Sequence, residues 1–319
     1  MKRLAALVFM LAFSAATAAQ GWPAKPVRVV VPAPAGSSLD IIVRMLGDKL
    51  KDRWGQPVVV DNKAGAGGML GMDAVAKAPA DGTTLGIGFN GPIAYGPFMY
   101  KKMPYDPAKD LLPVVLTTSQ PNVLAVQASN PANTLPEFVA WAKAQGNKLS
   151  YGSVGNGSSS HLTMELFKSV AGFEAVHVPY AGSPPAGTSL AAGETQALFA
   201  VAPALLPLIQ GGRVKLIGAT SLQRSESMKQ LPTFAEAGYP GFEALAWNGL
   251  FTAAGTPPDI VARINAEVNA VLKDPAVREQ LAKQGLIPGG GSAAEFKAFI
   301  EAESKTWGAI IKKNGITIE

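Results

Sequence analysis

Cysteine is absent from the 319 residues, and histidine occurs only twice, as His161 and His177. Without cysteine the chain has no disulfide, no thiol nucleophile and no cysteine-ligated zinc or iron–sulfur site. Two histidines are too few for a multi-histidine metal centre. We therefore expect no metal site, and nothing in the sequence indicates a cofactor.

Charge is also scarce. Charged residues make up 16% of the chain, against about a quarter in typical proteins, whereas 48% of the residues are hydrophobic. Such a chain buries a large core, which excludes wholesale disorder. The formal net charge is +5, but the basic residues are scattered, with no run of five or more. The sequence thus lacks the basic stripe of a nucleic-acid-binding protein, and we expect no nucleic-acid partner.

Long hydrophobic runs are missing as well. Lys2 and Arg3 precede an apolar stretch of about ten residues at 4–13, and the small residues that follow include Ala16-Thr17-Ala18. This order is typical of a signal peptide, and the stretch is too short for a membrane anchor. No later segment has 18 uninterrupted apolar residues. We expect a signal peptide at residues 1–19 and a soluble, exported mature protein.

Strand and helix patterns alternate through most of the mature chain. Residues 27–31 are almost continuously β-branched, as in a buried strand, and residues 40–50 carry apolar side chains at helical spacing. This alternation predicts an α/β protein with a parallel sheet. Further strands are expected at 58–60, 84–89, 123–126, 149–153, 175–178, 196–201 and 214–219, and further helices at 69–77, 135–144, 160–170, 186–192, 204–209, 259–272, 275–283 and 294–312.

Four loops rich in glycine, serine or proline each connect a predicted strand to a helix, at residues 34–38, 63–68, 155–160 and 180–183. A helix N-terminus offers unpaired backbone N–H groups and about half a positive charge. Each loop alone could be only a turn with a helix cap. Four of them in one chain favour a shared anion site that holds a carboxylate through backbone groups.

Catalytic patterns are incomplete. The chain has no G-x-S-x-G sequence, and the G-x-G-x-x-G match at residues 86–91 runs into Pro92, with Asp110 only near the place expected for the ribose-binding acid. Ser158 or Ser159 with His161 leaves a hydrolase open as an alternative, but the sequence nominates no acid to orient the histidine. We do not expect an enzyme.

Several single residues have two interpretations. Asp40 follows the first loop, where it either stabilises the helix start or orders water around a ligand. His177 lies in a predicted strand and is expected to be packed and hydrogen-bonded. Trp247 and Tyr180 either belong to the core or cover an apolar ligand body.

In several short segments the sequence resembles the substrate-binding proteins of tripartite tricarboxylate transporters, also called the Bug family. The likeness runs in order through essentially the whole mature chain. It is carried by Trp22-Pro23-Ala24-Lys25-Pro26-Val27, by Asp61-Asn62-Lys63-Ala64-Gly65-Ala66-Gly67-Gly68, by Ala80-Asp81-Gly82-Thr83-Thr84-Leu85, by Val178-Pro179-Tyr180 and by Ala254-Gly255-Thr256-Pro257.

The resemblance implies a type II periplasmic binding protein with two α/β lobes joined by two crossover strands, a hinge and a central ligand cleft. Lobe 1 is then expected at 20–121 and 225–319, and lobe 2 at 122–224. The hinge is expected near 116–123 and 219–222, continuing to 242–247. The implied function is periplasmic capture of a small organic acid for the membrane subunits of a transporter, by a monomer. A ligand sensor that acts on a signalling partner stays open as an alternative.

Carried over onto matching positions, the resemblance also implies a ligand-binding set. It comprises Pro34, Ala35, Gly36, Ser37, Ser38, Asp40, Phe89 and Asn90 in lobe 1, with Gly155, Asn156, Gly157, Ser158, Ser159, His161, Tyr180, Ala181, Gly182, Ala200 and Val201 in lobe 2.

The chain departs from the family pattern at five positions. Ser37 and Ser38 replace glycines, Leu39 stands where a hydroxyl residue is common, Ala181 replaces a lysine and Ser189 an aspartate. These changes predict a less polar distal pocket, and hence a ligand with an apolar or aromatic body rather than citrate.

Overall fold

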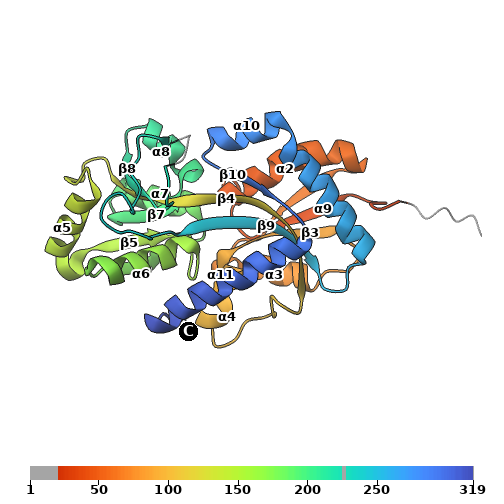
Figure 1. Ribbon diagram of the computed structural model, residues 1–319, viewed down its shortest axis with the longest axis horizontal. Helices are drawn as coiled ribbons and strands as arrows, with labels where there is room; N and C mark the ends of the chain where they lie inside the picture. Colours follow the sequence, from red (N-terminus) through yellow and green to blue (C-terminus); the bar gives the residue numbers. More distant parts are fainter. Residues whose placement is uncertain (1–20, 225–227, 319) are drawn as a thin grey trace, which may run out of the picture.

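The computed structural model describes residues 21–224 and 228–318, so the predicted signal peptide at 1–19 lies outside the described residues. The described chain forms two α/β lobes that lie side by side (Figure 1). Two long strands, β4 (Leu111–Gln127) and β9 (Leu245–Ala253), run between them. Within these ranges no helix combines the length and apolar character needed to cross a bilayer.

In the first lobe, β1 (Val27–Val31) lies between β2 (Val58–Asn62) and β3 (Thr84–Phe89), and both pairings are parallel. Strand β9 continues the sheet antiparallel to β3, β4 pairs with β9, and β10 (Ile287–Gly290) pairs with β4. The helical segments of this lobe are α2 (Ser38–Trp54), η1 (Ala66–Gly68), α3 (Met69–Ala76), the π-helical η2 (Gly91–Tyr95), α4 (Gly96–Met99), α9 (Pro258–Lys273), α10 (Pro275–Lys283) and α11 (Ala293–Lys313).

The second lobe is built around the far end of β4. This end pairs antiparallel with β7 (Ala197–Val201) and β8 (Val214–Ala219), while β5 (Ser150–Ser153) lies parallel between β7 and β6 (Val176–Pro179). Parallel strands bring their carboxyl ends, and the loops that follow, to one edge of a sheet. The helical segments are α5 (Leu135–Gln145), η3 (Gly146–Lys148), α6 (Ser159–Ala171), α7 (Ser183–Ala192), η4 (Ala202–Leu205) and α8 (Leu206–Gln210).

The crossover strands differ from the sequence prediction. The residue patterns predict a strand only at 123–126, whereas β4 begins at Leu111. They predict no strand at β9, although the family resemblance implies two crossover strands. Pro113 and Pro121 obscure β4, because proline is unusual inside a strand, and the register shifts between Pro113 and Val115. The predicted parallel pairing is correct within β1–β3 and β5–β7 but wrong for the predicted strands that became β4 and β8, which pair antiparallel. The exact lobe boundaries stay a prediction.

Aromatic contacts fix the C-terminal helix against the crossover. Phe296 of α11 meets Trp247 and Phe251 of β9 at ring-centroid distances of 5.7 and 5.3 Å, and all three side chains are buried. Burial of one such side chain stabilises the fold by roughly 1.5–3 kcal/mol. The strand that carries part of the inter-lobe cavity is therefore firmly held from the first lobe.

Candidate ligand-binding site

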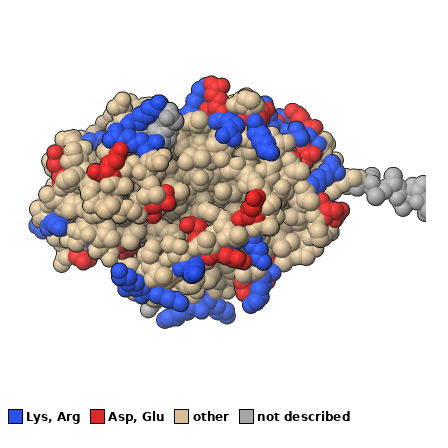
Figure 2. Space-filling model, in the orientation of Figure 1, with Lys and Arg blue, Asp and Glu red and all other residues tan. Residues whose placement is uncertain are grey.

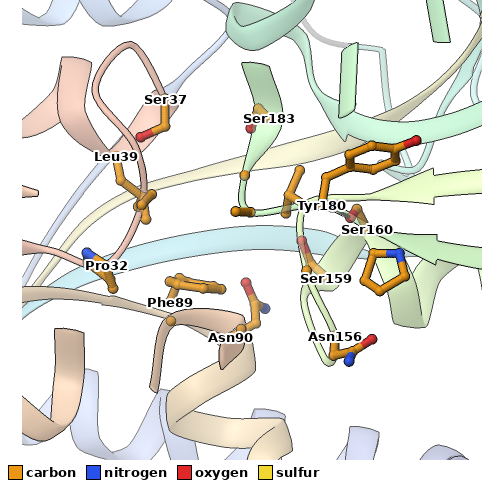
Figure 3. Close-up of a pocket in the computed structure, with 18 of the residues that line it drawn as sticks. Pro32, Ser37, Leu39, Phe89, Asn90, Asn156, Ser159, Ser160, Tyr180 and Ser183 are labelled. Carbon is orange, nitrogen blue, oxygen red and sulfur yellow. Dashed lines mark hydrogen bonds between the residues drawn. The ribbon is translucent and has the colours of Figure 1, made fainter. Parts of the chain in front are cut away.

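A cavity of about 670 Å³ lies between the lobes. Its walls are the carboxyl ends of β1 and β3, the loops that lead into α2, α3, α6 and α7, and the end of β7. The crossover strands β4 and β9 form its floor and run behind the side chains drawn in Figure 3. The loops of both lobes thus face one common space.

Helix α2 points its N-terminus at this cavity. Ser37 is the N-cap, and its Oγ accepts a hydrogen bond from Asp40 N at 3.3 Å. The amides of Ser38 and Leu39, in the first turn, have no acceptor within the helix. Ser37, Ser38 and Leu39 all line the cavity, where these amides are available to an anion (Figure 3).

Asp40 supports the α2 loop from behind and does not line the cavity. It accepts hydrogen bonds from Gly36 N at 3.0 Å, Asn62 Nδ2 at 3.1 Å and Arg44 Nε at 3.0 Å. Burial alone would raise the pKa of Asp40, but the hydrogen bonds from Arg44, Gly36 and Asn62 outweigh burial and lower this pKa. Asp40 is therefore an ionised anchor for the loop, which favours the first of its two interpretations.

The second lobe presents helix α6 in the same way. Ser158 is the N-cap, accepting from His161 N at 3.3 Å and donating to Gly155 O at 2.7 Å. Ser159 and Ser160 follow in the first turn and line the cavity. Figure 3 shows them on the side opposite Ser37 and Leu39. An anion between the lobes can therefore approach the N-termini of both helices.

Helix α7 adds a third N-terminus but only one amide near the cavity. Gly182 is the N-cap and Ser183 begins the helix, followed by Pro184 and Pro185, which have no N–H. Gly182 and Ser183 line the cavity, and the Tyr180 hydroxyl is hydrogen-bonded to Ser189 inside the lobe. Tyr180 thus offers its ring rather than its hydroxyl.

The electrostatics of the cavity favour an anion. Among the described residues that line it there is no aspartate, glutamate, arginine or histidine. The charged side chains in this described lining are Lys101 and Lys102, and both are exposed. On the face drawn in Figure 2, uncharged side chains predominate around the centre, interrupted by a few separate acidic ones. Three helix N-termini, each worth about half a positive charge, therefore face a ligand without an opposing carboxylate.

Most of the predicted site residues are brought together. Those that line the cavity are Ser37, Ser38, Phe89, Asn90, Gly155, Asn156, Ser159, Tyr180, Ala181, Gly182, Ala200 and Val201. Those that do not line it are Pro34, Ala35, Gly36, Asp40, Gly157, Ser158 and His161. That the first group contacts a ligand stays a prediction.

Asn90 lines the cavity, but its side chain is committed elsewhere. Its Nδ2 donates to Tyr95 OH at 2.7 Å and to Leu245 O at 3.1 Å, and its Oδ1 accepts from Trp247 N at 3.0 Å. The amide therefore ties the end of β3 to the crossover strand β9. Its donors and acceptor are occupied before any ligand arrives.

The two histidines form a stacked pair outside the cavity. Their ring centroids lie 3.9 Å apart with the planes 5° from parallel. His161 Nδ1 accepts from Gly157 N at 3.1 Å, and His177 Nε2 lies 2.7 Å from Ser153 Oγ. In the described chain neither Ser158 nor Ser159 hydrogen-bonds the His161 ring, so the geometry gives the hydrolase alternative no support. His161 instead supports the α6 loop.

This pair makes stability depend on pH. Burial and the nearby charge of Lys168 lower the pKa of His161 to about 4. Burial, His161 and Lys168 lower the pKa of His177 to about 3, although Glu165 acts in the opposite direction. Below about pH 6.5 the unfolded chain therefore binds protons that the folded chain does not. The free energy of unfolding should fall between pH 6.5 and about 4, by up to about 1.4 kcal/mol per pH unit for each histidine.

Urea unfolding at pH 7.5, 6.5, 5.5 and 4.5 measures this slope. The variant H161Q/H177Q should show a shallower slope than the unchanged protein, whatever its stability at pH 7.5. Equal slopes in the two proteins would show that the stacked pair does not carry the pH dependence.

Some cavity residues are absent from the sequence prediction. The loop at 63–68 is recognised as an anion loop, yet Gly65, Gly67 and Gly68 are not among the predicted ligand residues although they line the cavity. The floor residue Gln120 is also missing from them, because it belongs to the part of β4 that the sequence does not predict. The polar residues 117–120, which interrupt an apolar stretch of the sequence, could have indicated that this segment contributes to the site.

Comparison with known proteins agrees with this geometry. The family model TctC, described as the tripartite tricarboxylate transporter family receptor, matches residues 42–316. The UPF0065 protein in the tcbD-tcbE intergenic region of Pseudomonas sp. (strain P51) is 38% identical over 314 residues, covering 97% of this chain and 93% of the relative. Protein BugT of Bordetella pertussis is 35% identical over 307 residues, covering 96% of this chain and 94% of the relative.

Solved structures show the same fold. R. palustris Rpa4515 with adipate superposes with a TM-score of 0.91 at 36% identity, covering 93% of this chain and 99% of that one. MatC (Rpa3494) from Rhodopseudomonas palustris with bound malate superposes with a TM-score of 0.86 at 30% identity, covering 91% of this chain and 100% of that one. The predicted periplasmic-binding-protein fold is thus confirmed, and the chain belongs to the tripartite tricarboxylate transporter receptor (TctC) family.

Proposed function

We propose that this protein captures a small organic carboxylate in the inter-lobe cavity. The observation that carries the proposal is the convergence of helix N-termini from both lobes on a cavity whose described lining contains no acidic side chain. A carboxylate accepts hydrogen bonds from such amides and gains from the helix dipoles. The relatives solved with adipate and with malate support the ligand class.

The body of the acid is apolar or aromatic in this proposal. Phe89, Ala181, Ala200 and Val201 line the cavity, and none of them can bind a second or third carboxylate by a charge. The two lysines among the described lining residues, Lys101 and Lys102, are exposed. A compact tricarboxylate such as citrate would leave charged groups against these apolar side chains, which is costly.

The setting proposed for this function is the periplasm. One similar solved protein is described as the periplasmic binding protein BugD, and the family is that of transporter receptors. The protein would be exported through the predicted signal peptide at 1–19, act as a monomer and present its ligand to transporter membrane subunits. Closure of the lobes excludes water and strengthens the electrostatic contacts around the carboxylate.

Native mass spectrometry of the purified protein, followed by calorimetric titration, tests the proposal. We expect a co-purified organic acid, and at least tenfold tighter binding of benzoate or nicotinate than of citrate, which corresponds to a difference of about 1.4 kcal/mol or more in binding free energy. A clear preference for citrate would contradict the apolar body. Failure of every acid to bind would contradict the function itself.

A further inference from the structure

The floor of the cavity carries three side-chain amides. Gln120 and Asn122 belong to β4, and Asn248 belongs to β9. Gln120 pairs with Ala246 in the antiparallel ladder and Thr118 with Asn248. Because alternate residues of a strand share a face, these side chains lie in one row across the crossover.

Two of the three amides are held by the protein. Asn122 Nδ2 donates to Thr163 Oγ1 at 3.2 Å, and its Oδ1 accepts from Ser159 Oγ at 3.4 Å. Asn248 Nδ2 donates to Thr118 Oγ1 at 3.0 Å. These hydrogen bonds fix both amides before a ligand binds.

Gln120 differs from its neighbours. The residue is 2% exposed, and its Oε1 is buried without a hydrogen-bond partner. Of the six such side-chain atoms in the described chain, only this one belongs to a residue that lines the cavity. An unpaired buried polar group is costly, and in a native protein it calls for an explanation such as a missing ligand.

The chemistry of an amide limits what that ligand group can be. Gln120 offers two N–H donors and one carbonyl acceptor. A carboxylate of the ligand only accepts and would leave Oε1 unpaired. An ammonium group only donates, and no acidic side chain among the described lining residues would balance its charge. A hydroxyl group both donates and accepts.

The geometry allows Gln120 to reach such a group. No hydrogen bond holds its Oε1, and the terminal torsion of glutamine is soft. The amide can therefore turn its oxygen from the wall toward the cavity. The small side chain of its strand partner Ala246 leaves room beside it.

We propose that Gln120 is a specificity-determining residue that hydrogen-bonds a hydroxyl on the body of the bound acid. The protein accordingly selects hydroxy acids over the same acids without the hydroxyl. This inference rests on the proposed function, because it concerns the same cavity.

Matched acids test it. Affinities for 4-hydroxybenzoate and benzoate, and for malate and succinate, are measured by titration calorimetry on the unchanged protein and on Q120M, whose side chain has a similar length but no amide. In the unchanged protein the hydroxylated member of the better-bound pair should bind about five- to tenfold tighter. In Q120M this ratio should fall to about one. Comparing ratios within each protein cancels any general loss of affinity.

Q127M is the control, because Gln127 ends the same strand, donates to Ala191 O and does not line the cavity. It should keep the ratio of the unchanged protein. If the unchanged protein binds the two acids of the better-bound pair equally, or if Q120M keeps the affinity ratio of the unchanged protein, the proposed role of Gln120 is wrong. The proposed function is not affected by either result. Binding of none of the four acids, by a protein that also binds no acid of the wider panel, overturns both.

Discussion

Replacement of Gly91 by alanine should weaken ligand binding about ten- to hundredfold while the ligand-free protein stays folded. Gly91 begins η2 in the first lobe, and a Cβ on it would lie 2.8 Å from Gly157 O in the second lobe. Real Cβ atoms essentially never come this close to another heavy atom. Overpacking of this kind costs typically about 1–3 kcal/mol, and here the cost falls on the contact between the lobes that this structure shows.

Gly91 is well suited to this test. Its φ is not positive, so alanine avoids the left-handed region, and the added strain within its own chain is limited to the preference of a residue before Pro92 for extended backbone. Within its own lobe the nearest atom is on the Phe89 ring, at 3.2 Å, and that side chain needs to yield only slightly. Other glycines at the inter-lobe contact, Gly67 against Asn156 and Gly182 against Pro34, have positive φ and would add backbone strain.

Titration calorimetry with the tightest-binding acid gives the affinity, and thermal unfolding without ligand reports on the fold. G187A serves as the control, because Gly187 is also helical but faces the flexible end of Leu208 in its own lobe. Its affinity should stay within about threefold of the unchanged protein. An unaltered affinity in G91A would mean that the ligand does not need the lobes as close as they lie here.

Replacement of Asp40 by alanine should lower the free energy of unfolding by about 2–4 kcal/mol. The change removes the acceptor of Gly36 N and one of the two acceptors of Asn62 Nδ2, which also donates to Ala33 O. Hydrogen bonds to a charged group contribute about 1.5–3 kcal/mol each, and both donors here are only partly buried, which places each contribution in the lower part of that range. Loss of the contact with Arg44 lowers the stability less, because the Arg44 side chain is 54% exposed and can be solvated by water instead. Since the pKa of Asp40 is lowered on folding, this stabilisation is present above about pH 4 and is lost as the carboxylate is protonated.

Urea unfolding at pH 7.5 measures this effect, with D48A as the control. Asp48 lies on the same helix, is 76% exposed and forms an exposed ion pair with Lys51, so its removal should change stability by less than about 1 kcal/mol. If D40A is as stable as D48A, Asp40 does not anchor the loop. If D40A lost affinity without losing stability, Asp40 would instead act on the ligand, as in its second interpretation.

Local chemistry made much of the site predictable. Ser37 and Ser158 stand before apolar helical patterns, and both are N-caps in the structure. The glycine- and serine-rich loops follow predicted strands, so their convergence could be anticipated from the rule that parallel strands end at one edge. These features depend on residues close in sequence, which is why the sequence reveals them.

Features that depend on distant pairing could not be predicted. Gln120 reaches the floor only because β4 pairs with β9, more than a hundred residues away. The side-chain oxygen of Asn90 accepts a hydrogen bond from the backbone N of Trp247. The His161 ring lies outside the cavity, where it accepts a hydrogen bond from Gly157 N and stacks on His177. A sequence shows that such residues are polar and loop-borne but not which partner takes their hydrogen bonds.

A crystal structure with the tightest-binding acid tests the central claim most directly. We expect a carboxylate oxygen within about 3 Å of the backbone N of Ser38 or Leu39, and the acid enclosed between α2 and the first turn of α6 near Ser159 and Ser160. An acid held only by the side chains of Lys101 and Lys102 at the mouth, with those amides unoccupied, would contradict the account.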